Sequence, residues 1–133
     1  MVGKAIYSRL ASDGTVSGLV GTRIRPAMLR QEDALPALVY NVIANVHVNH
    51  VSGLAGLSHA RVQVDCWAAS HSAAETLAAA VRARLDGWSG SSGGVSVTGS
   101  LIIEDNYGDA LSLMDDDTMR GRITIDISVW YRE

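Results

Sequence analysis

The stretch Ile123-Thr-Ile-Asp-Ile-Ser-Val-Trp-Tyr131 is the most regular segment of the chain. Every odd-numbered position in it is large and apolar, and Trp130 is the one large apolar residue at an even-numbered position. A period of two is typical of a β-strand with one face in the core and the other outside it. The stretch therefore predicts a strand over residues 123–131 whose sheet is covered mainly on one face.

Two other alternating runs lie in the first half of the chain, at residues 38–48 and 61–67. The glycine-bearing segment over residues 52–58 is turn-like, so the two runs predict an antiparallel pair. In the first run we expect the more apolar face to be buried, and this face consists of Leu38, Tyr40, Val42, Ala44, Val46 and Val48.

Two further strands complete the expected sheet. Residues 23–26 end in proline, which is tolerated at a sheet edge, and they predict an edge strand. Residues 95–103 predict another strand, and the Ser/Gly-rich residues 88–94 before them predict a flexible connection.

Helical spacing is found in two places. Residues 3–11 predict a short helix, with a further turn over residues 15–19. Ser72 and Glu75 form a capping box, which predicts the start of a longer helix. Leu77 and the apolar residues after it at intervals of four form a stripe that we expect to lie on the sheet.

These elements predict an α+β fold, a single mainly antiparallel β-sheet with two α-helices packed on one face. With 133 residues the chain predicts one domain over residues 1–133. Hydrophobic residues make up 47% and charged residues 19%, a balance typical of a compact globular domain.

Charge and composition exclude several classes of function. A net charge of -3 makes strong non-specific binding to nucleic acid unfavourable. The one cysteine cannot form an internal disulfide, which fits a reducing cytoplasm. No apolar run reaches membrane-spanning length and the N-terminus lacks the apolar stretch of a signal peptide, so we expect a soluble protein with no membrane partner.

The residues do not form a pattern typical of catalysis, and we expect no catalytic residue, no metal site and no cofactor. Cys66 is on the apolar side of its run and is interpreted as a core thiol. The four histidines lack metal-ligand spacing. Asp65 and Asp126 leave one alternative open, a metal-dependent nuclease, because adjacent strand carboxylates can hold divalent metals.

Five blocks of the sequence, taken in their order and spacing, resemble the tail-completion (tail terminator-like) protein family of long-tailed bacteriophages and prophages. The blocks are Leu19-Val-Gly-Thr-Arg-Ile-Arg-Pro26, Leu35-Pro-Ala-Leu-Val-Tyr40, Ala60-Arg-Val-Gln-Val-Asp-Cys-Trp67, Ala74-Glu-Thr-Leu-Ala-Ala-Ala-Val-Arg-Ala-Arg-Leu-Asp86 and Ile125-Asp-Ile-Ser-Val-Trp-Tyr131.

The resemblance implies a structural virion protein that completes the tail tube at its head-proximal end and takes part in head-tail joining. It implies a hexameric ring of identical copies, made in the bacterial cytoplasm, with the tail-tube protein and a head connector or closure protein as partners. DNA would pass through the lumen without sequence-specific binding. A head-closure or connector protein elsewhere in the neck remains an alternative.

We expect the subunit interface to involve one acidic segment, three arginines and two tryptophans. Residues 104–117 contain six of the chain's fourteen acidic residues and no basic one. This segment could contact arginines of a neighbouring subunit, and large aromatic side chains on the polar sheet face would suit a subunit contact. The predicted interface residues are Arg23, Arg25, Arg30, Trp67, Trp130, Asp105, Asp109, Asp115, Asp116 and Asp117.

Overall fold

The computed structural model describes residues 2–29, 33–50, 53–106, 114–115, 118–119 and 121–132. Within these residues the helices are α1 (Val2–Ala11), α2 (Gly14–Val20) and α3 (His71–Leu85). The strands are β1 (Ile24–Pro26), β2 (Ala37–His50), β3 (Gly53–Ala68), β4 (Gly90–Ser92), β5 (Val95–Asn106), β6 (Met114–Asp115), β7 (Thr118–Met119) and β8 (Gly121–Arg132).

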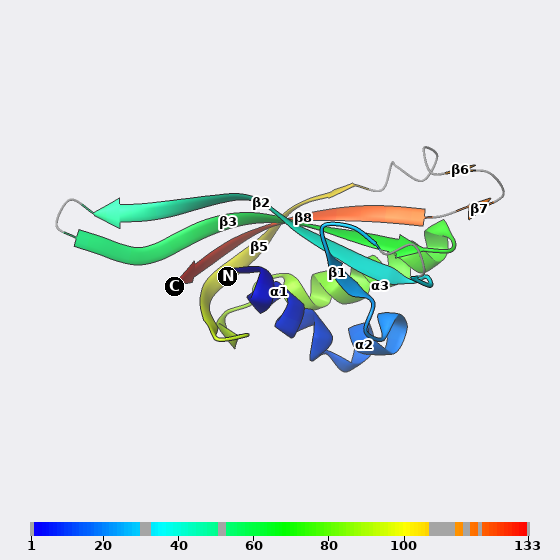
Figure 1. Ribbon diagram of the computed structural model, residues 1–133, viewed down its shortest axis with the longest axis horizontal. Coiled ribbons are helices and arrows are strands. Elements are labelled where there is room, and N and C mark those ends of the chain that lie inside the picture. The colour runs from blue at the N-terminus through cyan, green and yellow to red at the C-terminus, as the bar shows by residue number, and fades with distance from the viewer. Residues whose placement is uncertain are drawn as a thin grey trace.

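Six of these strands form one sheet in the order β1-β2-β3-β8-β5-β4, and the helices lie on one side of it (Figure 1). The four long strands β2, β3, β8 and β5 run antiparallel to their neighbours. The short edge strand β1 is parallel to β2, so the sheet is mixed. The predicted α+β class is confirmed, with α2 as a third, short helix beside the two expected ones.

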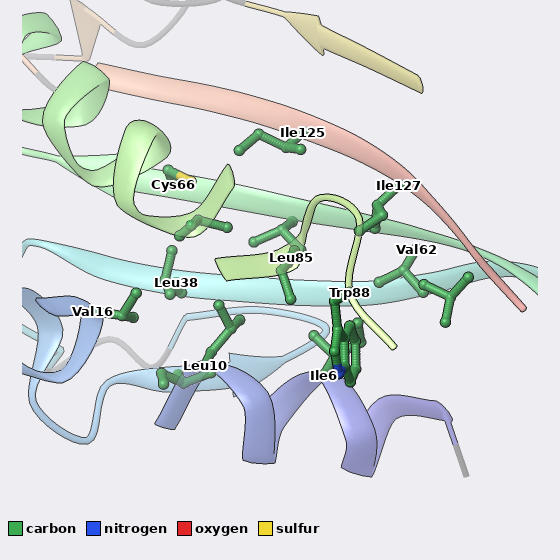
Figure 2. Packing of buried hydrophobic residues seen from close by; sticks show 14 of the residues in the cluster. Ile6, Leu10, Val16, Leu38, Val62, Cys66, Leu85, Trp88, Ile125 and Ile127 are labelled. Atoms are coloured by element: carbon green, nitrogen blue, oxygen red, sulfur yellow. The ribbon is translucent and has the colours of Figure 1, made fainter. Parts of the chain in front are cut away.

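The core lies between the helices and one face of the sheet (Figure 2). The odd-numbered positions of β8 from Ile123 to Tyr131 are fully buried, as the alternation predicts. From α3, Leu77, Val81 and Leu85 pack into the same cluster, which confirms the predicted stripe. Apolar side chains on both layers meet here because each amphipathic element must bury its apolar face.

The N-cap of helix α3 lies two residues before the predicted cap. Ser70 is the N-cap, and its side chain accepts a hydrogen bond from the amide of Ala73 at 3.1 Å. Ser72 lies inside the helix, so the predicted capping box is wrong. The start of β8 packs closely against this cap. There is no room for a side chain at Gly121, since a Cβ added there would lie 2.6 Å from the carbonyl oxygen of Ser70.

The predicted flexible connection over residues 88–94 is also wrong. Gly90–Ser92 form β4, which pairs with Val95–Val97 of β5, and the Trp88 side chain is buried. Ser100 of β5 donates a hydrogen bond to the carbonyl of Leu85 and accepts one from the amide of Trp88. The end of α3 and the chain after it are therefore bound to the sheet.

Strand β2 differs from its predicted burial pattern beyond its first residues. Leu38 is buried as expected, but a register shift between Val42 and Ala44 interrupts the pairing with β3. The extra residue reverses which side chains face the helices. Val46 is consequently exposed, and the expectation that residues 38–48 have one continuous buried face is wrong.

The turn predicted over residues 52–58 is mostly strand. Strand β3 begins at Gly53, and the pairs His50–Gly53 and Asn49–Leu54 close the β2–β3 hairpin. Strand β8 ends at Arg132, opposite Leu57, so the two strands run on past it as an arm (Figure 1).

Candidate interaction surface

The sheet face opposite the helices, here called the open face, carries cross-strand polar pairs between β3 and β8. Thr124 donates a hydrogen bond to the carboxylate of Asp65 at 2.8 Å. Arg61 forms an ion pair with Asp126 at 2.9 Å. Both carboxylates proposed for a nuclease thus have partners within the chain, a geometry typical of structural polar pairs rather than of a metal site.

Both tryptophans predicted for an interface lie on this open face, at opposite ends. The Trp130 ring stacks on His59 with centroids 4.0 Å apart, and the His59 ring hydrogen-bonds to Ser128. Trp67 lies eight positions from His59 along β3, roughly 26 Å at about 3.3 Å per residue, and the guanidinium of Arg122 lies 5.3 Å from its ring centroid. The shared face is confirmed, and an interface role for either ring stays a prediction.

Exposed apolar side chains lie on the open face in β2, β8 and β5. Val46 is 57% exposed, Leu101 is 63% exposed and Trp130 is 40% exposed. Beside them, Ile43 at the irregularity of β2 is 53% exposed. Large apolar residues that gather on a surface mark contact sites more often than singly scattered ones do.

The sequence alone did not reveal Val46 and Leu101 as surface residues. Val46 was assigned to the apolar face of its strand, and Leu101 was assigned to a strand without a face. The β-bulge that turns Val46 outward leaves no signal in the alternation. Leu101 lies opposite Ser128, and this polar residue on the neighbouring strand is the signal that could have indicated its exposure.

The arginines predicted for an interface make contacts within the chain. Arg25 binds both carboxylate oxygens of Asp33, at 2.9 and 3.1 Å. Arg23 donates a hydrogen bond to the carbonyl of Pro36 at 3.0 Å. Arg30 lies outside the described residues. These bonds join Asp33 and Pro36, which precede β2, to β1 and the residue before it. Contacts of these arginines with another subunit stay a prediction.

Most of the predicted acidic segment, residues 104–117, lies outside what the structure describes. Asp105 belongs to β5 and Asp115 to β6, which pairs with β7 in a separate two-stranded sheet, and only their backbone is described. Asp109, Asp116 and Asp117 are not among the described residues. Contact of this segment with a neighbouring subunit therefore stays a prediction.

Cys66 lies on the helix-covered face of β3 and is fully buried, as its position in the alternation predicts. Burial, and then the nearby charge of Asp65, raise the pKa of its thiol well above the ordinary value. A neutral buried thiol is a poor nucleophile, because the reactive species is the thiolate.

The surface of α3 carries a hollow. This hollow of about 330 Å³ is lined by His71, Glu75, Ala79 and Arg82, and His71 pairs with Glu75 across one helical turn at 2.8 Å. In the part of the chain that the structure describes, no three His, Cys, Asp or Glu residues are grouped to hold a metal ion. None of the described helices is both long and apolar enough for a membrane span.

The model of the family described as "Tail completion protein gp17" matches residues 4–132 of the chain. The chain belongs to this family. The match spans most of α1, all of α2 and α3, and every strand of the large sheet, so the resemblance found in the sequence is confirmed. A tail completion protein is a structural component of a phage-like virion.

A solved structure has a similar fold. The chain resembles a protein in the structure "Virion of native gene transfer agent (GTA) particle" with a TM-score of 0.73 and 16% sequence identity. The alignment covers 97% of this chain and 92% of that one. No curated protein sequence matches this chain. This chain and the chain of the gene transfer agent particle therefore share their fold over nearly their whole length.

Proposed function

We propose that this tail completion protein caps the tail tube at its head-proximal end and takes part in head-tail joining, as a ring of identical copies. The family match over almost the whole chain is the observation that carries this proposal. The open face supports it, because exposed apolar side chains on one sheet face suit contacts with other virion subunits.

A ring of six copies fits the size of the chain. A 133-residue globule has a radius of gyration near 14 Å and hence a diameter of roughly 36 Å. Six such bodies in contact enclose a hole of similar width, which a DNA duplex can enter. Each copy has a net charge of -3, so the ring would be negative as a whole and would let DNA slide through without trapping it.

The partners in this proposal are further copies of the chain, the tail-tube protein and a head connector or closure protein. Assembly takes place in the cytoplasm of the bacterial host. Light scattering of the purified protein, alone and with its tail-tube partner, tests the first two contacts. We expect a defined complex with the tube protein that exceeds the mass of either component.

Deletion of the gene from the particle-forming genome that encodes it tests the function. Electron microscopy should then show full heads without tails together with tubes of abnormal length, and a plasmid copy should restore complete particles. Full heads that leak DNA, beside tails of normal length, would instead indicate a head-closure protein. Normal particles in the deletion strain would contradict both functions.

Catalysis is not part of the proposal. The purified protein incubated with DNA and Mg²⁺ should leave the DNA intact. Cleavage that requires Mg²⁺ and disappears in the Asp65→Ala/Asp126→Ala double variant would support the nuclease alternative.

A further inference from the structure

The outer edge of β2 is covered over only its first residues. Strand β1 pairs with β2 at Leu38–Tyr40, and the chain after β1 adds one more bond, from the Ala27 amide to the Tyr40 carbonyl at 3.1 Å. Beyond Tyr40, no strand among the described residues lies beside the outer edge of β2 (Figure 1). This part of the strand, residues 41–50, is here called the free edge.

The free edge presents backbone groups that have no partner on the outer side. The amide of Leu38 and the carbonyl of Tyr40 both bond to the chain of β1. Alternation along a strand turns the N–H and C=O of every second residue to the same side, so those of Val42 also point outward. In the part of the chain that the structure describes, no group bonds to the outward amide of Val42. Another extended backbone is the group that supplies donors and acceptors at the matching spacing.

The chain leaves this edge open by turning away after β1. Ala27 has a φ of 72°, which residues other than glycine rarely adopt. Arg25 binds both carboxylate oxygens of Asp33, so the chain after this turn comes back beside β1. A chain that instead continued straight from Pro26 would cover the free edge itself. The turn therefore keeps the edge available to another chain.

The free edge also lacks the features that protect natural edge strands. Proteins usually shield such edges with lysine, other charges, proline or short length. Residues 34–60, which include all of β2 and the first half of β3, contain no Lys, Arg, Asp or Glu, although charged residues make up 19% of the whole chain. The free edge contains no proline either. It has the composition of a strand that is paired in its working state.

Exposed apolar side chains flank the free edge on both faces of the sheet. Val42 is 42% exposed and lies opposite Val62, whose side chain is buried on the helix-covered face. Val46 lies opposite His59, which stacks on Trp130 on the open face. A strand added along the edge would place alternate side chains beside Val42 on one face and beside Val46 on the other. Both valines would then be buried.

No other described edge of the chain complements the free edge. Two identical β2 edges would join copies in twos, and such a contact cannot continue around a ring. The outer edge of β5 is occupied near its centre, because the Ser100 carbonyl accepts a hydrogen bond from the Gly87 amide at 3.1 Å. The next outward group, the Ile102 amide, donates to the Asp86 carboxylate at 3.1 Å. Strands β1 and β4 are only three residues long.

We propose that the free edge of β2 binds an extended segment of a different virion protein, which adds to the sheet as a strand beside residues 41–48. The inference rests on the proposed function through the ring, which excludes a second β2 edge as the occupant. Backbone hydrogen bonds supply the affinity of such a contact, and side chains at alternate positions supply its specificity. The segment should have uncharged side chains next to Val42 and Val46, since a charge there would be buried without a partner.

Photo-cross-linking in assembled particles tests this contact. A photoreactive phenylalanine analogue is placed at Ala44 or at Val46, which are two residues apart and both exposed. After irradiation, the two variants should join to one segment of a single partner protein, at sites about two residues apart, as paired strands require. The same analogue at Leu101, which is exposed on the open face at β5, is the matched control and should give no cross-link to this segment.

A proline at position 42 tests the backbone part of the contact. Val42→Pro removes the outward amide, whereas Val42→Thr keeps both the amide and a β-branched side chain. Val42→Pro should lower the yield of complete particles at least about tenfold, and Val42→Thr should keep it within about twofold of the wild type. The melting temperatures of the two isolated variants should agree within about 5 °C, because the outward amide has no partner within the chain. A normal yield from Val42→Pro would contradict strand addition.

The outcomes separate this contact from the proposed function. Cross-links from position 46 to β2 of a second copy would show that like edges pair, which overturns the inference. Scattered cross-links, none at all, or equal cross-linking from position 101 would also overturn it. In each of these cases the chain is part of the particle and the proposed function stands. Complete particles that lack the chain would contradict the proposed function and the inference together.

Discussion

On the helix-covered face of β8 the side chains from Ile123 to Tyr131 are apolar and fully buried, whereas on its open face each side chain from Thr124 to Trp130 has a partner on β3. The partners are Asp65 for Thr124, Arg61 for Asp126, and His59 for Ser128 and Trp130. Burial of apolar area drives folding without direction, while pairs of this kind fix how two strands lie beside each other. One face therefore supplies stability, and the other supplies defined contacts and a surface.

The largest effect should come from a cavity on the covered face. Ile127→Ala is expected to lower the free energy of unfolding by about 2 to 5 kcal/mol, because Ile127 is fully buried. Leu101→Ala, on the exposed side of β5, should change it by less than about 0.5 kcal/mol in the isolated chain. Urea titration of both variants measures the contrast, and similar losses would break the distinction between the faces.

The next effect concerns a buried polar group that links α3 to the sheet. Ser100→Ala should cost about 1 to 3 kcal/mol, since the Leu85 carbonyl and the Trp88 amide would lose their buried partner. The matched control is Thr98→Ala, which removes an exposed hydrogen bond to the Trp130 carbonyl that water can replace. Thermal unfolding of the two variants should rank Ser100→Ala as clearly less stable.

Alkaline pH should lower the stability of the folded chain through Cys66. Burial raises the pKa of its thiol, so the folded chain keeps the proton while the unfolded chain releases it above about pH 8.5. The free energy of unfolding is therefore unaffected by the Cys66 thiol below that pH. As the pH rises further, it falls by about 1.4 kcal/mol per pH unit. Urea titrations at pH 8, 9 and 10 should show this loss, and Cys66→Ala should show a correspondingly smaller slope.

The smallest effect is expected on the open face. Arg61 is half exposed, so its ion pair with Asp126 should contribute only about 0.2 to 1 kcal/mol and should weaken with added salt. A double-mutant cycle with Arg61→Ala and Asp126→Ala measures this coupling. A coupling several times larger would mean that this pair contributes to stability as the covered face does.

The parts of the fold that depend on long periodic patterns could be predicted from the sequence. The alternation from Ile123 to Tyr131 and the stripe of α3 each repeat often enough to identify both the element and its buried face. The edge position of β1 followed from Pro26, which cannot donate to a further strand.

The parts that depend on single contacts between distant residues could not be predicted. The bulge near Ile43 is one inserted residue in an alternating run, and it alone decides that Val46 lies on the open face. Ser70 rather than Ser72 caps α3, and Gly121, which is 51 residues away in the sequence, packs closely against Ser70. For the candidate surface, the sequence identified Trp67 and Trp130 but missed Val46 and Leu101.

The β2–β3 arm has a consequence for the behaviour of the free chain in solution. A molecule drawn out in this way meets more friction from the solvent than a sphere of equal mass (Figure 1). It should sediment more slowly than a sphere and leave a size-exclusion column early. The mass from scattered light, rather than the elution volume, therefore distinguishes a lone copy from a pair.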